Sequence, residues 1–299
     1  ARDHPRRRLR RRVMDAPLHE SQLTACGIRT RVLQGGVNLR ATEAVVFVHG
    51  NPGSGADWGD LMRRLAPHGR VVAVDMPGFG KADKPADYPY SVEGGATFLG
   101  EALKQLGISR AHLVLHDFGG PWGLMWAAMS PLSVGSLTLI NTGVLLGFRW
   151  HTMARIWRTP ILGELQQWLT HRAGFKWALR QGSPRGLPDA FLDRMYDDFD
   201  AGTRRAVLKL YRATSEPGPR AEMLAKLLRP HPWPTLVVWG AADPYLPVTL
   251  AERQKEVFAK AEVVLLPSSG HFPFADDPQG VAQAVVPFLA QQLSHAHHP

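Results

Sequence analysis

Three side chains that can take part in hydrolytic chemistry each follow a short apolar run of the sequence. Asp117 comes just after the run 113–115, and Asp243 and His271 each follow a later run. A carboxylate can act as a nucleophile, and a histidine oriented by a second carboxylate can act as a general base. An Asp after a strand is often only a helix cap, and a loop histidine is often structural. The three positions together, in the order Asp, Asp, His, favour a catalytic site.

The apolar runs also predict the sheet that would position these residues. Runs that are apolar throughout are typical of strands buried on both faces of a parallel sheet. Their alternation with helix-like segments indicates a doubly wound, mostly parallel α/β fold, in which the strand ends meet at one edge where ligands bind. The predicted strands are 28–33, which alternates like a half-exposed antiparallel strand, and 44–48, 71–74, 113–115, 137–140, 236–239 and 263–266. The predicted helices are 58–66, 91–106, 119–129, 248–259 and 278–293.

One interval interrupts this alternation. Residues 143–230 contain no strand-like run but several helical patterns and four tryptophans, namely Trp150, Trp157, Trp168 and Trp177. A helical insertion between two strands of one sheet would form a lid over the edge that carries the candidate residues. We therefore predict a core of residues 15–142 and 231–293, a helical lid of residues 143–230, a disordered basic arm of residues 1–14 and a disordered tail of residues 294–299.

Two short motifs would shape the site. His116-Asp117-Phe118-Gly119-Gly120 predicts a sharp turn from strand to helix that raises the Asp117 side chain, and the glycines allow the strand and helix to approach closely. His49-Gly50-Asn51-Pro52 follows another buried strand, so its backbone N–H groups can point into the same edge.

From about residue 20 to residue 293 the sequence resembles the α/β-hydrolase superfamily. The residues that carry the resemblance are the segment His49-Gly50-Asn51-Pro52, the loop 75–80 (DMPGFG) and the elbow around Asp117. The resemblance implies that Asp243 and His271 are the acid and the base of a triad. Esterases and lipases carry Ser at the elbow where this chain carries Asp117, and this aspartate is similar to that of epoxide hydrolases and haloalkane dehalogenases.

The chemistry of such substrates explains an aspartate. An epoxide or an alkyl halide offers an sp³ carbon, and a carboxylate that is already ionised can attack it without activation. The product is an alkyl ester on Asp117, which water activated by His271 would hydrolyse while Asp243 stabilises the imidazolium. The oxyanion would be bound by the backbone N–H groups of Phe118 and Asn51.

The leaving group separates the two enzyme classes. Lys209-Leu210-Tyr211-Arg212 resembles the lid motif in which a tyrosine protonates the opening epoxide, although a buried tyrosine with a purely structural role fits equally well. A first lid tyrosine is missing from residues 143–195, and Tyr196 comes late, so His151 could assist instead. A dehalogenase needs inward N–H donors; Asn51 fits that pattern, but Phe118 has no side-chain donor.

The sequence therefore predicts an epoxide hydrolase that converts a hydrophobic epoxide to a diol. The alternatives are a haloalkane dehalogenase, an esterase-like hydrolase, and a non-catalytic homologue that binds a small ligand. We expect Asp243 to be the triad acid and Asn141 to lie outside the charge relay, because an amide carries no charge. The expected pocket residues are His116, Trp150, His151 and Phe272.

Composition excludes several other classes of protein. The 299 residues carry a formal net charge of +9, but seven arginines lie within residues 1–14, so we expect a dispensable arm and no nucleic-acid partner. The single cysteine, Cys26, excludes an internal disulfide and a cysteine-based zinc site. No run approaches the length of a bilayer span, and no apolar segment follows the arginines as in a secretory signal. We expect a cytoplasmic protein without membrane partner, cofactor or metal, whose partner is a small hydrophobic substrate.

Overall fold

The computed structural model describes residues 17–214 and 217–295. The expectations for the basic arm of residues 1–14 and for residues 296–299 of the predicted tail lie outside these residues, whereas residues 294 and 295, which we expected in that tail, belong to the last helix.

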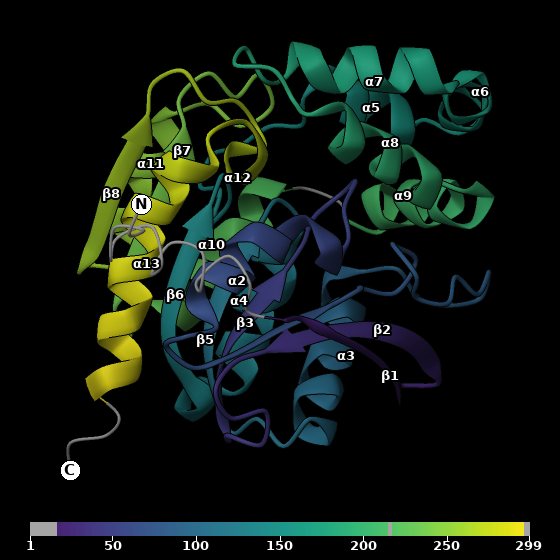
Figure 1. The fold of residues 1–299 in the computed structure, drawn as a ribbon. Helices are drawn as coiled ribbons and strands as arrows, with labels where there is room; N and C mark the ends of the chain where they lie inside the picture. The colour runs from purple at the N-terminus through teal and green to yellow at the C-terminus, as the bar shows by residue number, and fades with distance from the viewer. Residues whose placement is uncertain (1–16, 215–216, 296–299) are drawn as a thin grey trace, which may run out of the picture.

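A twisted sheet forms the centre of the molecule (Figure 1). Within the described residues it has eight strands in the order β1-β2-β4-β3-β5-β6-β7-β8. β1 and β2 pair antiparallel, as do β2 and β4, and all other neighbours are parallel. The strands are β1 (His19–Ala25), β2 (Ile28–Gly35), β3 (Glu43–Val48), β4 (Arg70–Val74), β5 (Arg110–His116), β6 (Val134–Ile140), β7 (Thr235–Gly240) and β8 (Ala261–Leu266). The mostly parallel α/β fold is confirmed.

Burial follows the apolar pattern along the strands. β4, β6 and β7 are buried at every position, as their continuous apolar runs predict. β1 was not predicted, because five of its seven residues are polar and most of them are exposed. It forms only through pairing with β2 at the edge of the sheet.

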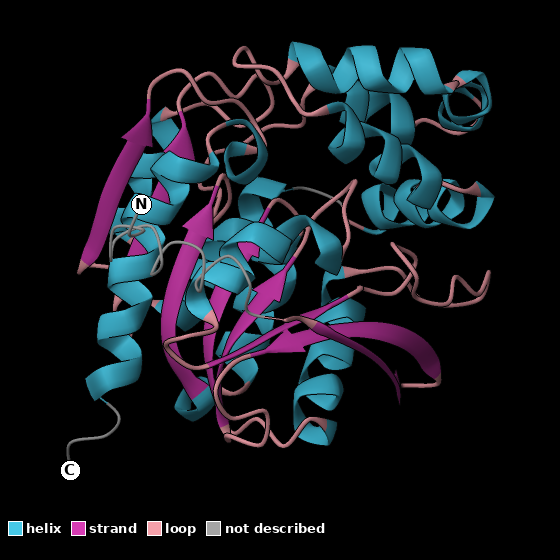
Figure 2. Ribbon diagram, in the orientation of Figure 1, coloured by secondary structure: helices cyan, strands magenta, loops and turns pink. Residues whose placement is uncertain are grey.

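Helices cover both faces of the sheet (Figure 2). α3 packs on α4, and α13 packs on α2. The helices beside the sheet are α2 (Gly59–Leu65), α3 (Val92–Gln105), α4 (Gly119–Met129), α11 (Thr249–Arg253), α12 (Pro273–Asp276) and α13 (Pro278–His295). The side chain of Ser91 caps α3 by accepting from the backbone N–H of Gly94 at 3.0 Å.

The segment between β6 and β7 forms a helical lid above the carboxyl edge of the sheet (Figure 1). Its helices are α5 (Thr152–Arg158), α6 (Leu162–Leu169), α7 (Arg172–Gln181), α8 (Asp189–Asp198), α9 (Ala201–Ala213) and α10 (Pro217–Leu228). α10 differs from the others because it packs beside the sheet against α4. The cover over the strand ends is therefore made by α5 to α9.

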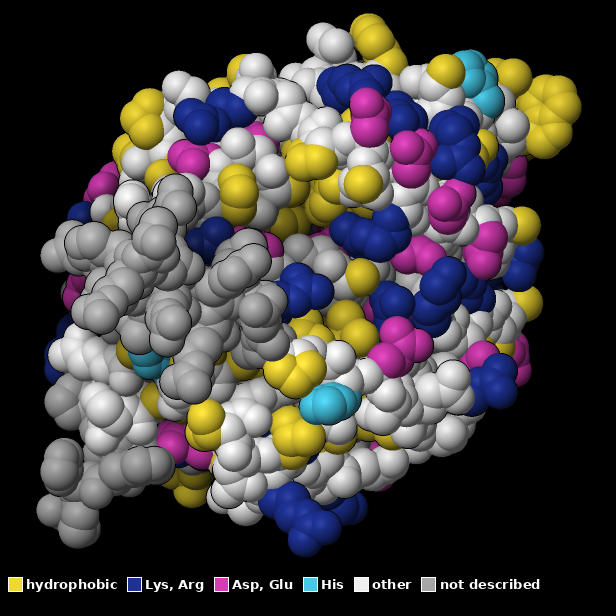
Figure 3. Space-filling model, in the orientation of Figure 1, with side chains coloured by type: hydrophobic (Ala, Val, Ile, Leu, Met, Phe, Trp, Pro, Cys, Tyr) yellow, Lys and Arg dark blue, Asp and Glu magenta, His cyan; other side chains and the backbone are white. Residues whose placement is uncertain are grey.

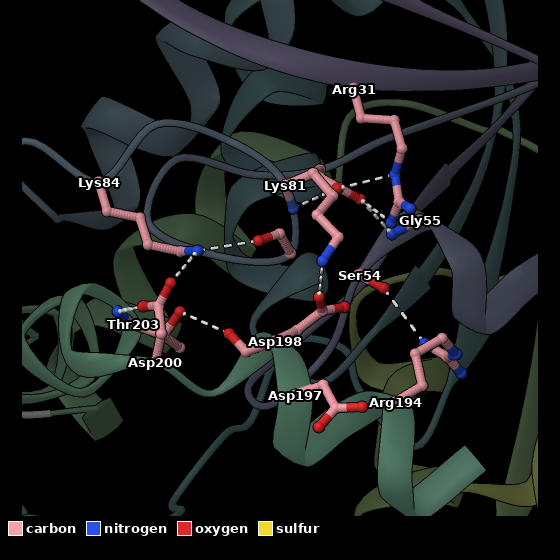
Figure 4. A network of polar contacts seen from close by, with 12 residues as sticks. Arg31, Ser54, Gly55, Lys81, Lys84, Arg194, Asp197, Asp198, Asp200 and Thr203 are labelled. Atoms are coloured by element: carbon pink, nitrogen blue, oxygen red, sulfur yellow. Dashed lines mark hydrogen bonds and ion pairs between the residues drawn. The ribbon is translucent and has the colours of Figure 1, made fainter. Parts of the chain in front are cut away.

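Ion pairs join the lid to the core (Figure 4). Lys81 and Lys84, which follow β4, pair with Asp198 and Asp200 at 2.8 and 2.9 Å. One turn earlier on α8, Arg194 pairs with Asp57 at 2.7 Å, and the Asp57 side chain is only 2% exposed. Figure 3 shows that basic and acidic side chains also lie side by side on the surface over α8 and α9.

Candidate active site

Asp117 stands at a strained turn between β5 and α4. Its φ of +48° lies in the left-handed region, which is costly for a residue with a side chain and is typically kept at functional sites. The hydroxyl of Thr142 donates to the Asp117 carbonyl at 2.7 Å and holds the turn. A Cβ at Gly50 would lie only 2.3 Å from the Cβ of Asp117. Glycine at position 50 therefore allows the neighbouring loop to reach the carboxylate.

The three residues singled out from the sequence lie together at the carboxyl edge. His271 Nδ1 is 2.7 Å from Asp243 Oδ2, and His271 Nε2 is 3.7 Å from Asp117 Oδ2. All three side chains are largely buried beneath the lid. The Nδ1–H of His271 donates to Asp243, which leaves Nε2 facing the Asp117 carboxylate and any group bound to it.

The loop that carries His271 is fixed by both the core and the lid. The carboxylate of Asp276 accepts from the Ser269 hydroxyl at 2.5 Å and from the Gly270 N–H at 2.8 Å. The backbone N–H of His271 donates to the carbonyl of Gly182, at the end of α7, at 2.9 Å. The position of the histidine therefore depends on the docking of the lid.

Asn141 contacts Asp243 directly. It directly follows β6, and its Nδ2 donates to Asp243 Oδ2 at 2.7 Å while its Oδ1 accepts from the Gly240 N–H at 2.8 Å. Asn141 supplies no charge to His271, as expected, but it holds Asp243 as a neutral hydrogen-bond donor. The negative charge beside the histidine still comes from Asp243.

Opposing effects set the protonation of the triad. Burial raises the pKa of Asp117, and the charge of His271 and the backbone N–H groups of Asn51 and Phe118 offset this only in part. Burial raises the pKa of Asp243 as well, but His271 and Asn141 outweigh it, so that this pKa lies below its usual value. Burial lowers the pKa of His271, and the two carboxylates reverse this, so its pKa lies above 6.5.

The loop after β3 places a backbone N–H donor on the Asp117 carboxylate. The backbone N–H of Asn51 donates to Asp117 Oδ1 at 2.6 Å. His49 fixes this loop: its Nε2 accepts from the Met76 N–H at 2.9 Å, so its Nδ1 carries the proton and donates to the Gly50 carbonyl at 2.9 Å. The backbone N–H groups of Asn51 and Phe118 both donate to the Asp117 carboxyl group, which would become the ester.

Tyr211 reaches the site from α9. Its side chain is buried, its ring packs against Phe118, Trp150 and Trp157, and its hydroxyl lies 3.5 Å from Asn51 Nδ2. Burial, followed by the charge of Asp117, raises the pKa of Tyr211 well above 10. This hydroxyl therefore keeps its proton at neutral pH, next to the carboxylate.

His151 is a neutral imidazole at the start of α5. Its Nδ1 accepts from the Ala154 N–H at 3.2 Å, which assigns the ring proton to Nε2. Burial, followed by the charge of His271, lowers the pKa of His151 to about 4. It can donate a hydrogen bond but does not ionise at neutral pH.

Two cavities meet at Asp117. The larger measures about 610 Å³ and lies beneath α5, α6 and α7, and the smaller measures about 90 Å³ and lies between α4 and α10. Both are lined by Asp117, His151, Tyr211 and Tyr245. Of the other expected pocket residues, Trp150 lines the smaller cavity and Phe272 lines the larger one.

His116 lines neither cavity, in contrast to what the sequence suggested. At the end of β5, the ring of His116 packs against Trp58 and Phe274 and against the ring of His271. Burial lowers the pKa of His116 well below its usual value, and its Nε2 lies 2.8 Å from the backbone carbonyl of His271. His116 therefore positions the catalytic loop from behind.

The sequence reasoning missed two residues that line the larger cavity. Tyr245 follows the triad acid by two residues, and its ring centroid lies 5.1 Å from that of His271. Its closeness to Asp243 along the chain could have indicated it. Gln167 on α6 is 4% exposed, and no sequence signal marked it.

Other kinds of site are not evident in the described part of the chain. No group of three or more His, Cys, Asp or Glu residues there could hold a metal ion. No helix of residues 17–214 and 217–295 is long and apolar enough to cross a membrane.

Known proteins share this fold and parts of the sequence. The haloalkane dehalogenase 2 of Mycobacterium bovis is 27% identical over 259 residues, which cover 81% of this chain and 86% of the relative. The crystal structure of the haloalkane dehalogenase DatA from Agrobacterium tumefaciens C58 superposes with a TM-score of 0.80 at 22% identity, over 94% of this chain and 99% of that one. The epoxide hydrolase CorEH superposes with a TM-score of 0.78 at 19% identity, over 92% and 99% of the two chains.

These solved structures share the fold, and the sequence itself matches a family. Residues 43–278, well over half of the chain, match the family described as the alpha/beta hydrolase fold. The match extends from β3 to the start of α13, and so includes the elbow, the acid, the histidine and the lid. The chain belongs to the α/β-hydrolase fold family.

Proposed function

We propose that this protein is an epoxide hydrolase that forms an alkyl ester on Asp117 and releases a diol. The observation that carries the proposal is the buried hydroxyl of Tyr211, which lines the same cavities as the Asp117 carboxylate. An epoxide oxygen needs a proton as its ring opens, and a tyrosine that keeps its proton at neutral pH can supply one.

The first step opens the ring. A carboxylate oxygen of Asp117 attacks one oxirane carbon and forms the ester bond, and the electron pair of the breaking C–O bond moves to the epoxide oxygen. That oxygen takes the proton of the Tyr211 hydroxyl, which leaves a phenolate. The side chain of Asn51, 3.5 Å from this hydroxyl, can donate to the phenolate as it forms.

The second step hydrolyses the ester. His271 Nε2 takes a proton from water, and the hydroxide adds to the ester carbon of Asp117, while Asp243 stabilises the imidazolium. The N–H groups of Asn51 and Phe118 bind the oxyanion. When the intermediate collapses, the leaving alkoxide takes the proton from His271, and the carboxylic acid of Asp117 returns its proton to the Tyr211 phenolate. The net reaction adds one water to one epoxide.

A haloalkane dehalogenase is the second candidate, and the side chain of Asn51 favours it. This amide lies in the larger cavity and could hold a departing halide. Phe118 offers no second N–H donor to a halide, and the indole N–H of Trp157 donates to Gln166 at 2.7 Å, so the ring N–H of His151 in the same cavity is a candidate for that role. Epoxide opening requires only the backbone N–H of residue 118, so a phenylalanine side chain at this position does not impair it.

Product analysis separates these candidates. The purified protein is incubated with styrene oxide-like epoxides and, separately, with bromoalkanes, and the diol and the bromide are measured. We expect diol from epoxides, and we expect Tyr211→Phe to abolish most of it. Bromide release that survives Tyr211→Phe and is lost in Asn51→Ala, without any diol, would favour the dehalogenase.

A further inference from the structure

Six large hydrophobic side chains are exposed together on the outer helices of the lid. They lie on α6, on the residue before it and on α7, and they are between 47% and 79% exposed: Ile161, Leu162, Leu165, Trp168, Leu169 and Trp177. Six of the twelve large hydrophobic side chains that are exposed in the described residues thus fall within residues 161–177. Figure 3 shows hydrophobic side chains beside basic ones at the end of the lid where α6 lies. We call these six residues the lid patch.

The lid patch lies at the mouth of the larger cavity. Four of its members also line that cavity, namely Leu162, Leu165, Leu169 and Trp177. A side chain that lines a cavity and is about half exposed stands where the cavity opens to the surface. Ile161 and Trp168 line neither cavity, and they extend the patch over the outer surface of the lid. An apolar route therefore connects the surface of the lid with Asp117.

The composition of the lid patch suits a lipid layer. Clustered exposed apolar side chains commonly mark a surface that contacts a partner or a membrane. Tryptophan combines an apolar ring with a polar N–H, and it is enriched where lipid headgroups meet acyl chains. Trp168 and Trp177 are 78% and 65% exposed. The patch thus carries side chains of the kind that insert at a shallow depth into lipid.

The part of the lid around the patch is basic. Residues 149–188 contain α5, α6 and α7, and they carry seven Arg or Lys residues and one acidic residue, Glu164, which pairs with Arg212 at 2.7 Å. The cations of α7 pair with aspartates of α8. Arg149 and Arg155 are exposed and pair with no carboxylate of the described residues. An apolar surface flanked by cations matches anionic headgroups and the acyl chains beneath them.

A second copy of the chain fits this surface less well. Two lid patches in contact would bring the arginines of both copies together, and like charges across an interface repel. Such a contact would also cover the mouth of each larger cavity. A lipid layer meets neither objection, because its anionic headgroups neutralise the cations and its interior holds apolar molecules.

We propose that the lid patch docks onto a lipid layer with anionic headgroups, and that an apolar substrate passes from this layer into the larger cavity. We expected no membrane partner because the sequence contains no bilayer span, but shallow docking of a surface requires none. The docking is independent of the reaction, whereas the delivery of an apolar epoxide rests on the proposed function.

Co-sedimentation of the full chain with vesicles tests the docking. The vesicles contain equal amounts of phosphatidylcholine and phosphatidylglycerol. Trp168→Gln should weaken binding about tenfold, since burial of one large apolar side chain typically contributes at least that factor. Leu132→Gln is the matched control and should bind as the wild type does. Leu132 is 96% exposed, but it precedes β6 and so lies at the opposite edge of the sheet from the lid.

A second pair of variants tests the role of charge. Arg155→Gln should weaken binding about fivefold, the usual effect of removing one cation near an anionic lipid surface. Arg40→Gln, in the turn between β2 and β3, removes another exposed arginine and should have little effect. The arginines of residues 1–14 are present in every variant, so differences between the variants report the lid.

Several results would overturn the docking. The proposal fails if the wild type does not bind the vesicles, or if Trp168→Gln and Leu132→Gln bind equally well. Equal effects of Arg155→Gln and Arg40→Gln would contradict the part played by anionic headgroups. A wild-type dimer that Trp168→Gln converts to a monomer in gel filtration, without vesicle binding by either, would identify the patch as an interface between copies.

Turnover separates the docking from the proposed function. A long-chain epoxide dissolved in the vesicles is compared with a short, water-soluble epoxide. Trp168→Gln should slow conversion of the first and keep kcat/KM for the second, because Trp168 lines neither cavity. Vesicle binding without conversion of either epoxide would overturn the proposed function alone. Conversion of both epoxides at wild-type rates by Trp168→Gln would overturn the delivery of substrate from lipid.

Discussion

The side-chain amide of Asn141 donates to the same Oδ2 atom of Asp243 that accepts from His271 Nδ1, in both cases at 2.7 Å. Two donors on one oxygen fix the carboxylate, while its other oxygen accepts from the backbone N–H groups of Tyr245 and Leu246 at 2.8 and 3.1 Å. Asp243 is therefore rigid and ionised, as a residue that orients an imidazole must be.

Replacing Asn141 by leucine should slow ester hydrolysis without abolishing it. A hydrogen bond to a charged group contributes about 1.5–3 kcal/mol, so the loss in rate should be about 10- to 100-fold. Single-turnover kinetics should show ester hydrolysis slowed more than ester formation. Equal slowing of both steps would indicate that Asn141 only supports the fold.

The pH dependence should report His271. This residue must be neutral to take a proton from water, and the carboxylates raise its pKa above 6.5. The rate of ester hydrolysis should therefore increase with pH as His271 loses its proton, and because Asp117 is an uncharged ester in this step, Asp243 is the carboxylate that still raises the pKa of His271. Burial lowers the pKa of His271, and the charge of Asp243 is the largest effect that raises it. Asp243→Asn removes this charge, so the pH midpoint of its residual activity should be lower than that of the wild type. A midpoint that stays in place in this variant would contradict the assigned roles.

Activity should persist on the alkaline side. Tyr211 must be protonated to open the ring, and burial together with Asp117 raises its pKa well above 10. The rate of ester formation should then remain level up to about pH 10, the value at which an ordinary tyrosine begins to ionise. A decline between pH 8 and pH 9 would point to another proton donor.

Tyr211→Phe should slow ester formation far more than ester hydrolysis. The hydroxyl acts only while the ring opens, and general acid catalysis typically contributes about 10²–10⁴-fold. A loss toward the upper part of that range is expected. Stopped-flow tryptophan fluorescence can separate the two steps, since Trp150 and Trp157 pack against Tyr211. Unchanged ester formation would remove Tyr211 from the mechanism.

Arg194→Met should weaken the attachment of the lid. Its partner Asp57 is buried, and removing one member of a buried pair leaves an uncompensated charge, which costs on the order of 3 kcal/mol. Lys84→Met is the matched control, because its partner Asp200 is half exposed and such pairs contribute about 1 kcal/mol or less. Denaturant unfolding of both variants tests this, and equal destabilisation would contradict it.

The sequence predicted the site because parallel strands place their ends at one edge. Asp117 directly follows β5, Asn141 directly follows β6, and Asn51 lies three residues after β3. Because these strands are neighbours in the sheet, the three residues lie close together. Tyr211 was found through a lid motif alone. The bare sequence could not place it over the cavity, because that position depends on how α9 packs.

Other features depended on orientation, which local patterns do not determine. His116 is adjacent to Asp117, but its ring packs against Trp58 and Phe274 and lines neither cavity. Gln167 is buried on α6, although glutamine on a lid helix is expected at an exposed position. β1 has too little apolar character to be recognised without its partner β2.

Mass spectrometry of a trapped intermediate tests the central claim most directly. His271→Gln keeps the nucleophile but removes the base, so incubation with an epoxide should leave the alkyl ester on Asp117. We predict that the peptide containing Asp117 gains the mass of one epoxide, and that the double variant Asp117→Ala/His271→Gln gains none. Asp117→Ala alone should also lose all turnover while keeping its unfolding temperature. An adduct on another residue, or full turnover by Asp117→Ala, would contradict the mechanism.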